Sequence, residues 1–271
     1  MKNLPTPINQ KDLQDLTQAK KLLEDVGFAI KVANYLGRPI EFGLKKLDSD
    51  LINRASKLAL EKSLDIALST IDKDIKSPSN TKHKFLATLS GAMGGFFGMN
   101  ALVIELPVST TIMLRSIADI AKSQGHNLNL AETKLACLEV FSLGSSKTTD
   151  DDGSESGYYA IRSTLAYEMK LAIKAVEGMS KKAIKQAIIK GEMPILVKLI
   201  ESIASRFGVT VSQKVVAEAI PIIGAVGGGG INYLFMSHFQ QMATGHFIIK
   251  RLEKRYGSQN IEIAYRNIVI N

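Results

Sequence analysis

Apolar residues recur every three or four positions along most of the chain, which is the period of an amphipathic helix. The clearest example lies within 47–72, where Leu60, Leu64, Ala67 and Ile71 form one stripe. The strict alternation of apolar and polar residues that marks a half-buried strand does not persist anywhere in the sequence. The pattern therefore predicts an all-α, multi-helix globular domain.

Proline, glycine and short polar runs divide this pattern into separate elements. Pro107 is expected to kink or break the long apolar run 81–124. A helix ending at Phe207 is expected to close at Gly208, and Thr210 is expected to cap the next one. The tail 258–271 is expected to dock as a short helix or strand. The remaining predicted helices cover about 10–26, 47–72, 129–143, 158–190 and 231–256.

The domain organisation follows from the distribution of polar residues. Residues 1–10 are predicted to form a flexible tail, and 11–271 a single helical domain. Within this domain, 145–157 is predicted to be a polar loop, and it is the clearest discontinuity in the chain. The sequence contains no internal repeat of fixed period.

Two apolar segments, 91–114 and 215–236, are rich in glycine. Small residues spaced four apart form a flat groove on a helix, which another helix backbone can enter. Each glycine inside a helix costs about 1 kcal/mol relative to alanine, so packing must offset the loss. We expect two central helices packed on each other, with lipid or a ligand as the other possible partners. The glycines at this spacing are Gly91 and Gly95, Gly94 and Gly98, and Gly224 and Gly228.

The chain carries 34 Lys and Arg against 26 Asp and Glu, a formal net charge of +8. This balance favours an acidic partner, and we expect an anionic membrane surface or a membrane protein. Nucleic acid is not expected, because the basic residues are dispersed and no recognition motif is present. The oligomeric state is left open.

Cys137 is the single cysteine, so the chain can form no internal disulfide, and it lies in an apolar helical stretch typical of a core position. The N-terminal residues lack the apolar run of a signal peptide. We therefore expect a cytoplasmic protein, with a peripheral position at the inner membrane as a further option.

Glu105 is the most informative candidate for chemistry, because a carboxylate in an apolar segment is costly unless it is paired or protonated. Pairing with Arg115 is the favoured interpretation, and a proton carrier, a metal ligand and a general base remain open. His238 and His246 lie eight residues apart, about 80° around a helix axis, too far apart to share one metal ion. These four residues are the catalytic candidates.

Metal and cofactor sites are not expected. The sequence has no His-Glu-x-x-His motif, no Cys/His cluster and no phosphate loop. A ligand-binding role is indicated for Tyr158 and Arg162, which are four residues apart at a helix start and can face one partner.

A set of motifs in a fixed order resembles the EcsC family of bacterial proteins, from about residue 50 onward. The resemblance implies a helical fold and a cytoplasmic or membrane-proximal setting, and it implies no reaction. The family takes its name from a gene in an ABC-transporter operon. Two motif residues, Asn232 and Gln240, join Tyr158 and Arg162 as candidate ligand-binding residues. The motifs are Gly94–Gly95, Glu105–Pro107, Met113–Ala118, Cys137–Phe141, Glu155–Tyr159, Arg162, Pro221–Ala225, Asn232, Phe235, His238–Gln240, His246–Phe247, Leu252–Glu253 and Tyr256–Gly257.

We therefore expect a non-enzymatic accessory or interaction protein at the cytoplasmic membrane face, with a transporter as one partner considered. One alternative is a hydrolase with an unfamiliar site built from Glu105, Arg115, His238 and His246. The other is a module that binds a lipid or a small apolar ligand between the glycine-rich helices. The position of Glu105 relative to the two histidines distinguishes a scaffold from a site.

Overall fold

In its described part, the computed structural model of the chain consists of helices joined by turns and contains no strand, which confirms the predicted all-α class. The described residues are 7–25, 27–37, 44, 47–69, 102–144, 157–218 and 224–270. The helices are α1 (Gln10–Leu23), α2 (Phe28–Leu36), α4 (Ser49–Ser69), α6 (Leu102–Ser123), α7 (Ala131–Glu139), the 3-10 helix η2 (Val140–Ser142), α8 (Gly157–Val176), α9 (Lys181–Ile189), α10 (Pro194–Glu218), α11 (Gly224–Tyr256) and α12 (Ser258–Asn267).

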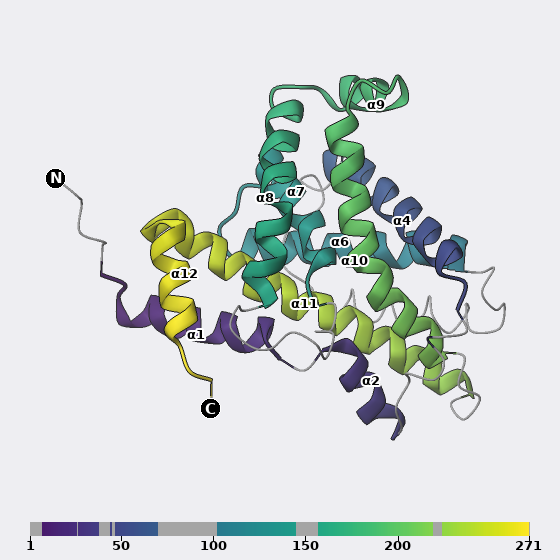
Figure 1. Cartoon of the computed structure of the whole chain (residues 1–271), viewed down its shortest axis with the longest axis horizontal. Helices are drawn as coiled ribbons and strands as arrows, with labels where there is room; N and C mark the ends of the chain where they lie inside the picture. The colour runs from purple at the N-terminus through teal and green to yellow at the C-terminus, as the bar shows by residue number, and fades with distance from the viewer. Residues whose placement is uncertain are drawn as a thin grey trace.

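The long helix α11 is the element around which the others assemble. It contacts α1, α2, α6, α10 and α12, and it crosses the lower half of the molecule in Figure 1. Its buried face carries the aromatic core: the Phe239 ring lies 5.2 to 5.6 Å from the rings of Phe141, Phe207 and Phe235. These contacts bring η2, α10 and α11 together, and aromatic pairs in such edge-on arrangements add to the stabilisation from burial.

A second group of helices packs beside this core. Helix α4 contacts both α6 and α10, and α8 contacts α10. The small helix α9 lies at one extremity of the molecule, beyond the ends of α8 and α10 (Figure 1). Its main contacts with the body are with α4 and α10.

The C-terminal tail docks as a helix, which confirms one of the two expected forms. Ile261 and Tyr265 of α12 are fully buried. The Lys20 ammonium of α1 donates to the backbone carbonyls of Tyr265, at 2.9 Å, and Ile268, at 2.7 Å. The Tyr265 carbonyl also accepts from the Ile268 amide at 3.3 Å, so Lys20 adds a second donor there and a donor to the Ile268 carbonyl beyond the helix end.

The expected helix end at Gly208 is wrong, because α10 continues through it to Glu218. Thr210 is a buried interior residue of this helix and does not cap another. A Cβ at Gly208 would lie 3.1 Å from Asn53 Oδ1 on α4. This glycine therefore serves the close approach of two helices.

The predicted helix 158–190 is also wrong in one respect, because it is two helices, α8 and α9. Gly178 between them adopts a left-handed φ of 73°, and the Ser180 hydroxyl caps α9 by accepting from the Ala183 amide at 3.3 Å. At Pro107 the expected break does not occur, since α6 continues through it. The proline removes one amide donor, the one that would bond the Val103 carbonyl.

The glycine-rich segments are described only in part. Gly91, Gly94, Gly95 and Gly98 lie outside the described residues, as do 1–6 of the predicted tail and 145–156 of the predicted polar loop. The run 224–230 forms the first turns of α11. Helices α6 and α11 contact each other, and pairing of the glycines across them stays a prediction.

Gly245→Ala is expected to destabilise the protein by about 1–3 kcal/mol, the usual range for overpacking. The new Cβ would lie 2.6 Å from Leu23 Cγ and 3.0 Å from the Ala19 carbonyl oxygen, so α1 must move away from α11. Helix propensity alone predicts the opposite, a gain of about 1 kcal/mol. Urea unfolding measures the difference. Gly208→Ala is the comparison and should cost less, since it meets a side-chain atom that can turn. An unchanged or higher midpoint for Gly245→Ala would contradict the close packing.

Candidate functional site

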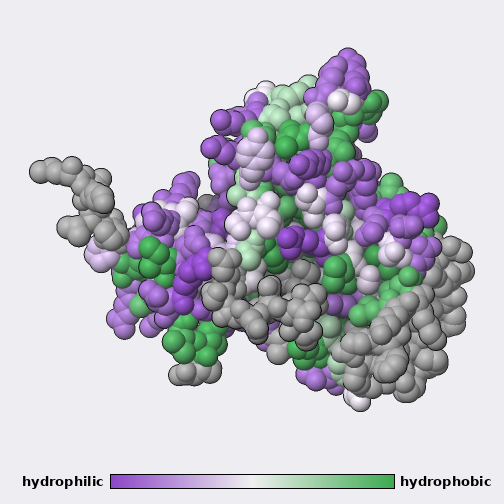
Figure 2. Space-filling model, viewed as in Figure 1, coloured by the Kyte–Doolittle hydropathy of each residue, from purple (hydrophilic) through white to green (hydrophobic). Residues whose placement is uncertain are grey.

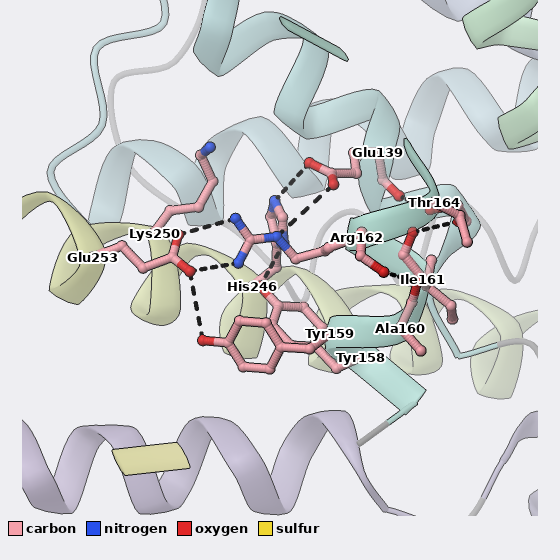
Figure 3. A network of polar contacts seen from close by, with 12 residues as sticks. Glu139, Tyr158, Tyr159, Ala160, Ile161, Arg162, Thr164, His246, Lys250 and Glu253 are labelled. Atoms are coloured by element: carbon pink, nitrogen blue, oxygen red, sulfur yellow. Dashed lines mark hydrogen bonds and ion pairs between the residues drawn. The ribbon is translucent and has the colours of Figure 1, made fainter. Parts of the chain in front are cut away.

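A group of polar side chains, here called the Arg162 cluster, lies where the end of α7, the start of α8 and the second half of α11 meet (Figure 3). His246 and Glu253 are seven residues apart and so share one face of α11. The first two turns of α8 supply three more members. The cluster consists of Glu139, Tyr158, Tyr159, Arg162, His246 and Glu253.

The strongest interaction of the cluster joins Arg162 to Glu253. The guanidinium donates from Nη1 to Glu253 Oε1 at 2.6 Å and from Nη2 to Oε2 at 3.0 Å, a bidentate arrangement. The same guanidinium carbon lies 5.3 Å from the ring centre of Tyr158 and 5.7 Å from that of Tyr159. The Glu253 side chain is 9% exposed and that of Arg162 19%. Because water is largely excluded, each buried charge is stabilised mainly by the opposite charge of its partner.

His246 is fully buried between a phenol and a carboxyl group. Its Nδ1 lies 3.0 Å from Tyr158 Oη, and its Nε2 lies 3.5 Å from Glu139 Oε2. Burial, reinforced by the positive charge of Arg162, holds the pKa of His246 well below its ordinary value. Burial also raises the pKa of Tyr158, so the phenol keeps its proton and its O–H donates a hydrogen bond to Nδ1. The hydrogen-bond pattern then assigns the imidazole proton to Nε2, facing Glu139.

Glu139 completes the row from phenol to imidazole to carboxyl. Burial raises the pKa of its carboxyl group, although the positive charge of Arg162 opposes the shift, with Nε 4.0 Å from Oε1. In such a row, each hydrogen bond determines which atom of the next group carries a proton. General acid–base catalysis also requires a substrate atom within hydrogen-bond reach. The His246 side chain is 0% exposed, so it serves here as a tie between helices.

Glu105 belongs to a different group, the Lys214 cluster of Glu105, Lys214 and Glu218. The Lys214 ammonium donates to both Glu105 oxygens, at 3.0 and 2.9 Å, and lies 3.5 Å from Glu218 Oε1. Burial disfavours the charge on this fully buried lysine, but the two carboxylates more than offset that effect and raise its pKa. Burial raises the pKa of Glu218.

The expected pairing of Glu105 with Arg115 is wrong. Arg115 is an exposed residue of α6, and it lies ten residues beyond Glu105 on the same helix. At a rise of 1.5 Å per residue, the two positions are about 15 Å apart. The partner is Lys214, which α10 supplies from 109 residues further along the chain.

His238 has a third, apolar environment. Its ring lies 5.7 Å from the Phe28 ring and 5.2 Å from the Phe239 ring, and burial lowers its pKa to about 3. The backbone of Gly144 covers its other side: a Cβ there would stand 2.4 Å from His238 Nε2. Gly144 also has a left-handed φ of 71°, so both the conformation and the space require glycine.

The catalytic candidates are therefore not gathered into one site. Glu105 pairs with Lys214, while His246 lies with Tyr158 and Glu139. His238 is eight residues from His246 on α11, about 12 Å along the axis. Among the described residues, no three His, Cys, Asp or Glu side chains are placed to hold a metal ion.

The ligand-binding candidates are also only partly brought together. Tyr158 and Arg162 contact each other within the Arg162 cluster. Gln240 instead donates to Ser116 Oγ at 2.7 Å and joins α11 to α6, and Asn232 is buried nearer the start of α11. Their shared role in binding stays a prediction.

Glu139, Lys214 and Glu253, which form the partners in both clusters, were not among the candidate site residues, although Glu139 and Glu253 lie within the EcsC-like motifs. One signal was available for each of them. Glu139 and Lys214 are charged residues on the apolar face of a predicted helix, and Glu253 shares a helix face with His246. Such positions require a partner of opposite charge.

Two hollows flank α9, and their linings contain no residue of either cluster. One, of about 590 Å³, lies between the start of α7 and the end of α8. The other, of about 370 Å³, lies between α4, α9 and α10 and is lined by Leu64, Ile188 and Leu196 among others.

The chain belongs to the EcsC protein family, whose family model matches residues 12–252. This confirms the resemblance that the motifs indicated, and the matched range includes nearly all members of the two clusters, with only Glu253 just beyond its end. No match was found among curated proteins or among solved structures. Within the described part of the chain, no helix combines the length and the apolar character needed to span a bilayer.

Arg162→Met should destabilise the protein by about 3 kcal/mol or more, because it leaves the Glu253 carboxylate buried without its cation. Arg206→Met is the control: this arginine makes a single exposed bond to Thr164 and should cost about 1 kcal/mol or less. The double variant Arg162→Met/Glu253→Met should recover part of the loss, since it removes the isolated charge. Chemical unfolding at pH 7 measures all three. Equal losses for Arg162→Met and Arg206→Met would show that the ion pair is unimportant.

His238→Gln should make the stability less dependent on pH. The folded pKa of about 3 lies below the unfolded value of 6.5, so the wild type loses stability as the pH falls from 6.5 towards 3. Each such histidine contributes a slope of up to about 1.4 kcal/mol per pH unit. Urea unfolding between pH 6.5 and 4 gives the slope of the unfolding free energy against pH for each protein. A loss of packing in the variant that is the same at every pH does not change this slope. Identical slopes would mean that His238 titrates normally in the folded protein.

Proposed function

We propose that the chain is a non-enzymatic accessory or interaction protein at the cytoplasmic face of a membrane, acting on anionic lipid or beside a membrane protein such as a transporter. The observation that carries this proposal is the use of the polar candidates as ties between helices. Arg162 joins α8 to α11, Lys214 joins α10 to α6, and Gln240 joins α11 to α6.

The distribution of charge supports the membrane part of the proposal. The two clusters contain two cations, Arg162 and Lys214, and four carboxyl groups, so they contribute nothing to the excess of positive charge. The net charge of +8 therefore resides on residues outside the two clusters. A basic surface raises the local concentration of acidic partners and is favoured at anionic membranes.

The alternatives gain less support. A hydrolase built from Glu105, Arg115, His238 and His246 would need these groups within reach of one substrate, and they lie in separate environments. A ligand held between the glycine-rich helices would involve 91–101, which lies outside the described residues.

The full chain is expected to co-sediment with vesicles that contain an anionic phospholipid at 0.1 M salt, and not with purely neutral vesicles. Raising the salt to 1 M shortens the Debye length from about 10 Å to about 3 Å and should release most of the bound protein. Equal binding to neutral and anionic vesicles, or binding that resists 1 M salt, would contradict an electrostatic association. Absence of binding to either would remove the lipid surface from the proposal.

A further inference from the structure

The tip of the molecule around α9 rests on the body through a small buried face and is rich in lysine. Ile184 and Ala187 form the buried side of α9, which rests on α4 and α10. The segment 178–191 contains four lysines and no acidic residue, so it accounts for half of the net charge of +8. Three of these lysines, Lys182, Lys185 and Lys190, have described side chains. Among these three, the one ion pair is a 4.0 Å contact of Lys190 with the neighbouring Glu192.

That contact does little to neutralise the tip. The side chains of Lys190 and Glu192 are 65% and 61% exposed, and ion pairs of this kind contribute little free energy. Lys182 and Lys185 are exposed as well. The tip therefore presents its positive charge to the surroundings.

An isoleucine lies in the middle of this charge. At 100° per residue, Ile189 points between Lys182 and Lys185, on the side of α9 opposite Ile184 and Ala187. Ile189 is 75% exposed, although it also reaches the edge of the 370 Å³ hollow. In Figure 2, hydrophobic and hydrophilic atoms lie side by side over α9 at the top of the molecule.

We propose that this tip is the part of the protein that docks on an anionic bilayer, with Ile189 entering the headgroup layer and the lysines contacting lipid phosphates. The inference rests on the proposed function and names its contact surface. Two contributions favour the binding of basic helices with exposed apolar side chains to the membrane interface. These are the burial of the apolar side chains and the attraction of the basic residues to anionic lipid.

The shape of the tip favours a bilayer over an acidic protein. Helix α9 lies at the extremity of the molecule, beyond the ends of α8 and α10 in Figure 1, where a flat surface can approach it. Met179, which is 37% exposed, precedes α9 at the turn that contains Gly178 and adds a second apolar side chain to the tip. A protein partner would need a concave acidic surface to surround the same residues.

The test compares two double charge reversals in the full chain, K182E/K185E at the tip and K11E/K21E on α1. All four lysines are exposed, and both variants lower the net charge by the same amount. Binding to phosphatidylcholine vesicles with about 30% phosphatidylglycerol is measured by sedimentation at 0.1 M salt. Since each lysine near such a surface changes affinity about fivefold, K182E/K185E should bind at least about 20-fold more weakly, and K11E/K21E should lose less than about threefold.

The outcomes separate the inference from the proposed function. Binding by the wild type with equal losses in both variants, or with no loss in K182E/K185E, overturns tip docking and leaves membrane association intact. Failure of the wild type to bind these vesicles overturns both tip docking and association with a lipid surface, and leaves a membrane protein as the partner class.

A fluorescence measurement tests the apolar contact directly. The chain contains no tryptophan, so Ile189→Trp introduces a single reporter at the tip. Its emission should shift to shorter wavelength with anionic vesicles and remain unchanged with neutral ones. Tyr167→Trp, at a position 71% exposed on α8, is the matched control and should not shift. A shift in the control alone, or in neither variant while the wild type binds, would contradict insertion of Ile189.

Discussion

The two hydrogen bonds between the Arg162 guanidinium and the Glu253 carboxylate, at 2.6 and 3.0 Å, fix the position of α8 on the central helix α11. Each charge is largely removed from water, so neither can be buried without the other. The neighbouring Tyr158 and Tyr159 rings lie 5.9 and 5.1 Å from the Tyr265 ring, which extends the same contact to α12. The ion pair and the tyrosine rings beside it thus join three helices.

The same constraint operates at the other end of α11. Lys214 reaches Glu105 on α6, and its ammonium also lies 5.4 Å from the Phe235 ring of α11. Buried pairs of this kind add little to stability relative to an apolar core, but they penalise any arrangement that separates the partners. We infer that the two clusters fix the register of α6, α8 and α10 against α11, in a core whose aliphatic and aromatic contacts are less selective.

The two clusters contain more carboxyl groups than cations, so the excess of positive charge lies outside them, and α9 carries a large part of it. This helix adds little to the core, since Ile184 and Ala187 form its buried face. The fold therefore combines a body held by interhelical ion pairs with a basic tip whose exposed residues are not required for packing. This division favours a tip that acts in recognition while the body acts as its support.

The helical class, the docking of the C-terminal tail and the EcsC family could all be predicted from the sequence. The spacing of apolar residues and the order of motifs are both read directly along the chain, without knowledge of how the helices pack. The sequence did not separate α8 from α9, since Val176 and Met179 continue the apolar stripe across the turn at Gly178. It also misread Gly208 as a helix end, although the same residue type serves close packing against α4.

The candidate site depended still more on the tertiary structure. Glu105, Arg162 and His246 are polar side chains in helices with apolar faces, which indicated that each needs a partner. Lys214 lies 109 residues from its partner Glu105, and Glu253 lies 91 residues from its partner Arg162. Only the packing of helices decides which side chains meet at such separations, because spacing along one helix constrains neighbours within a few turns and no further.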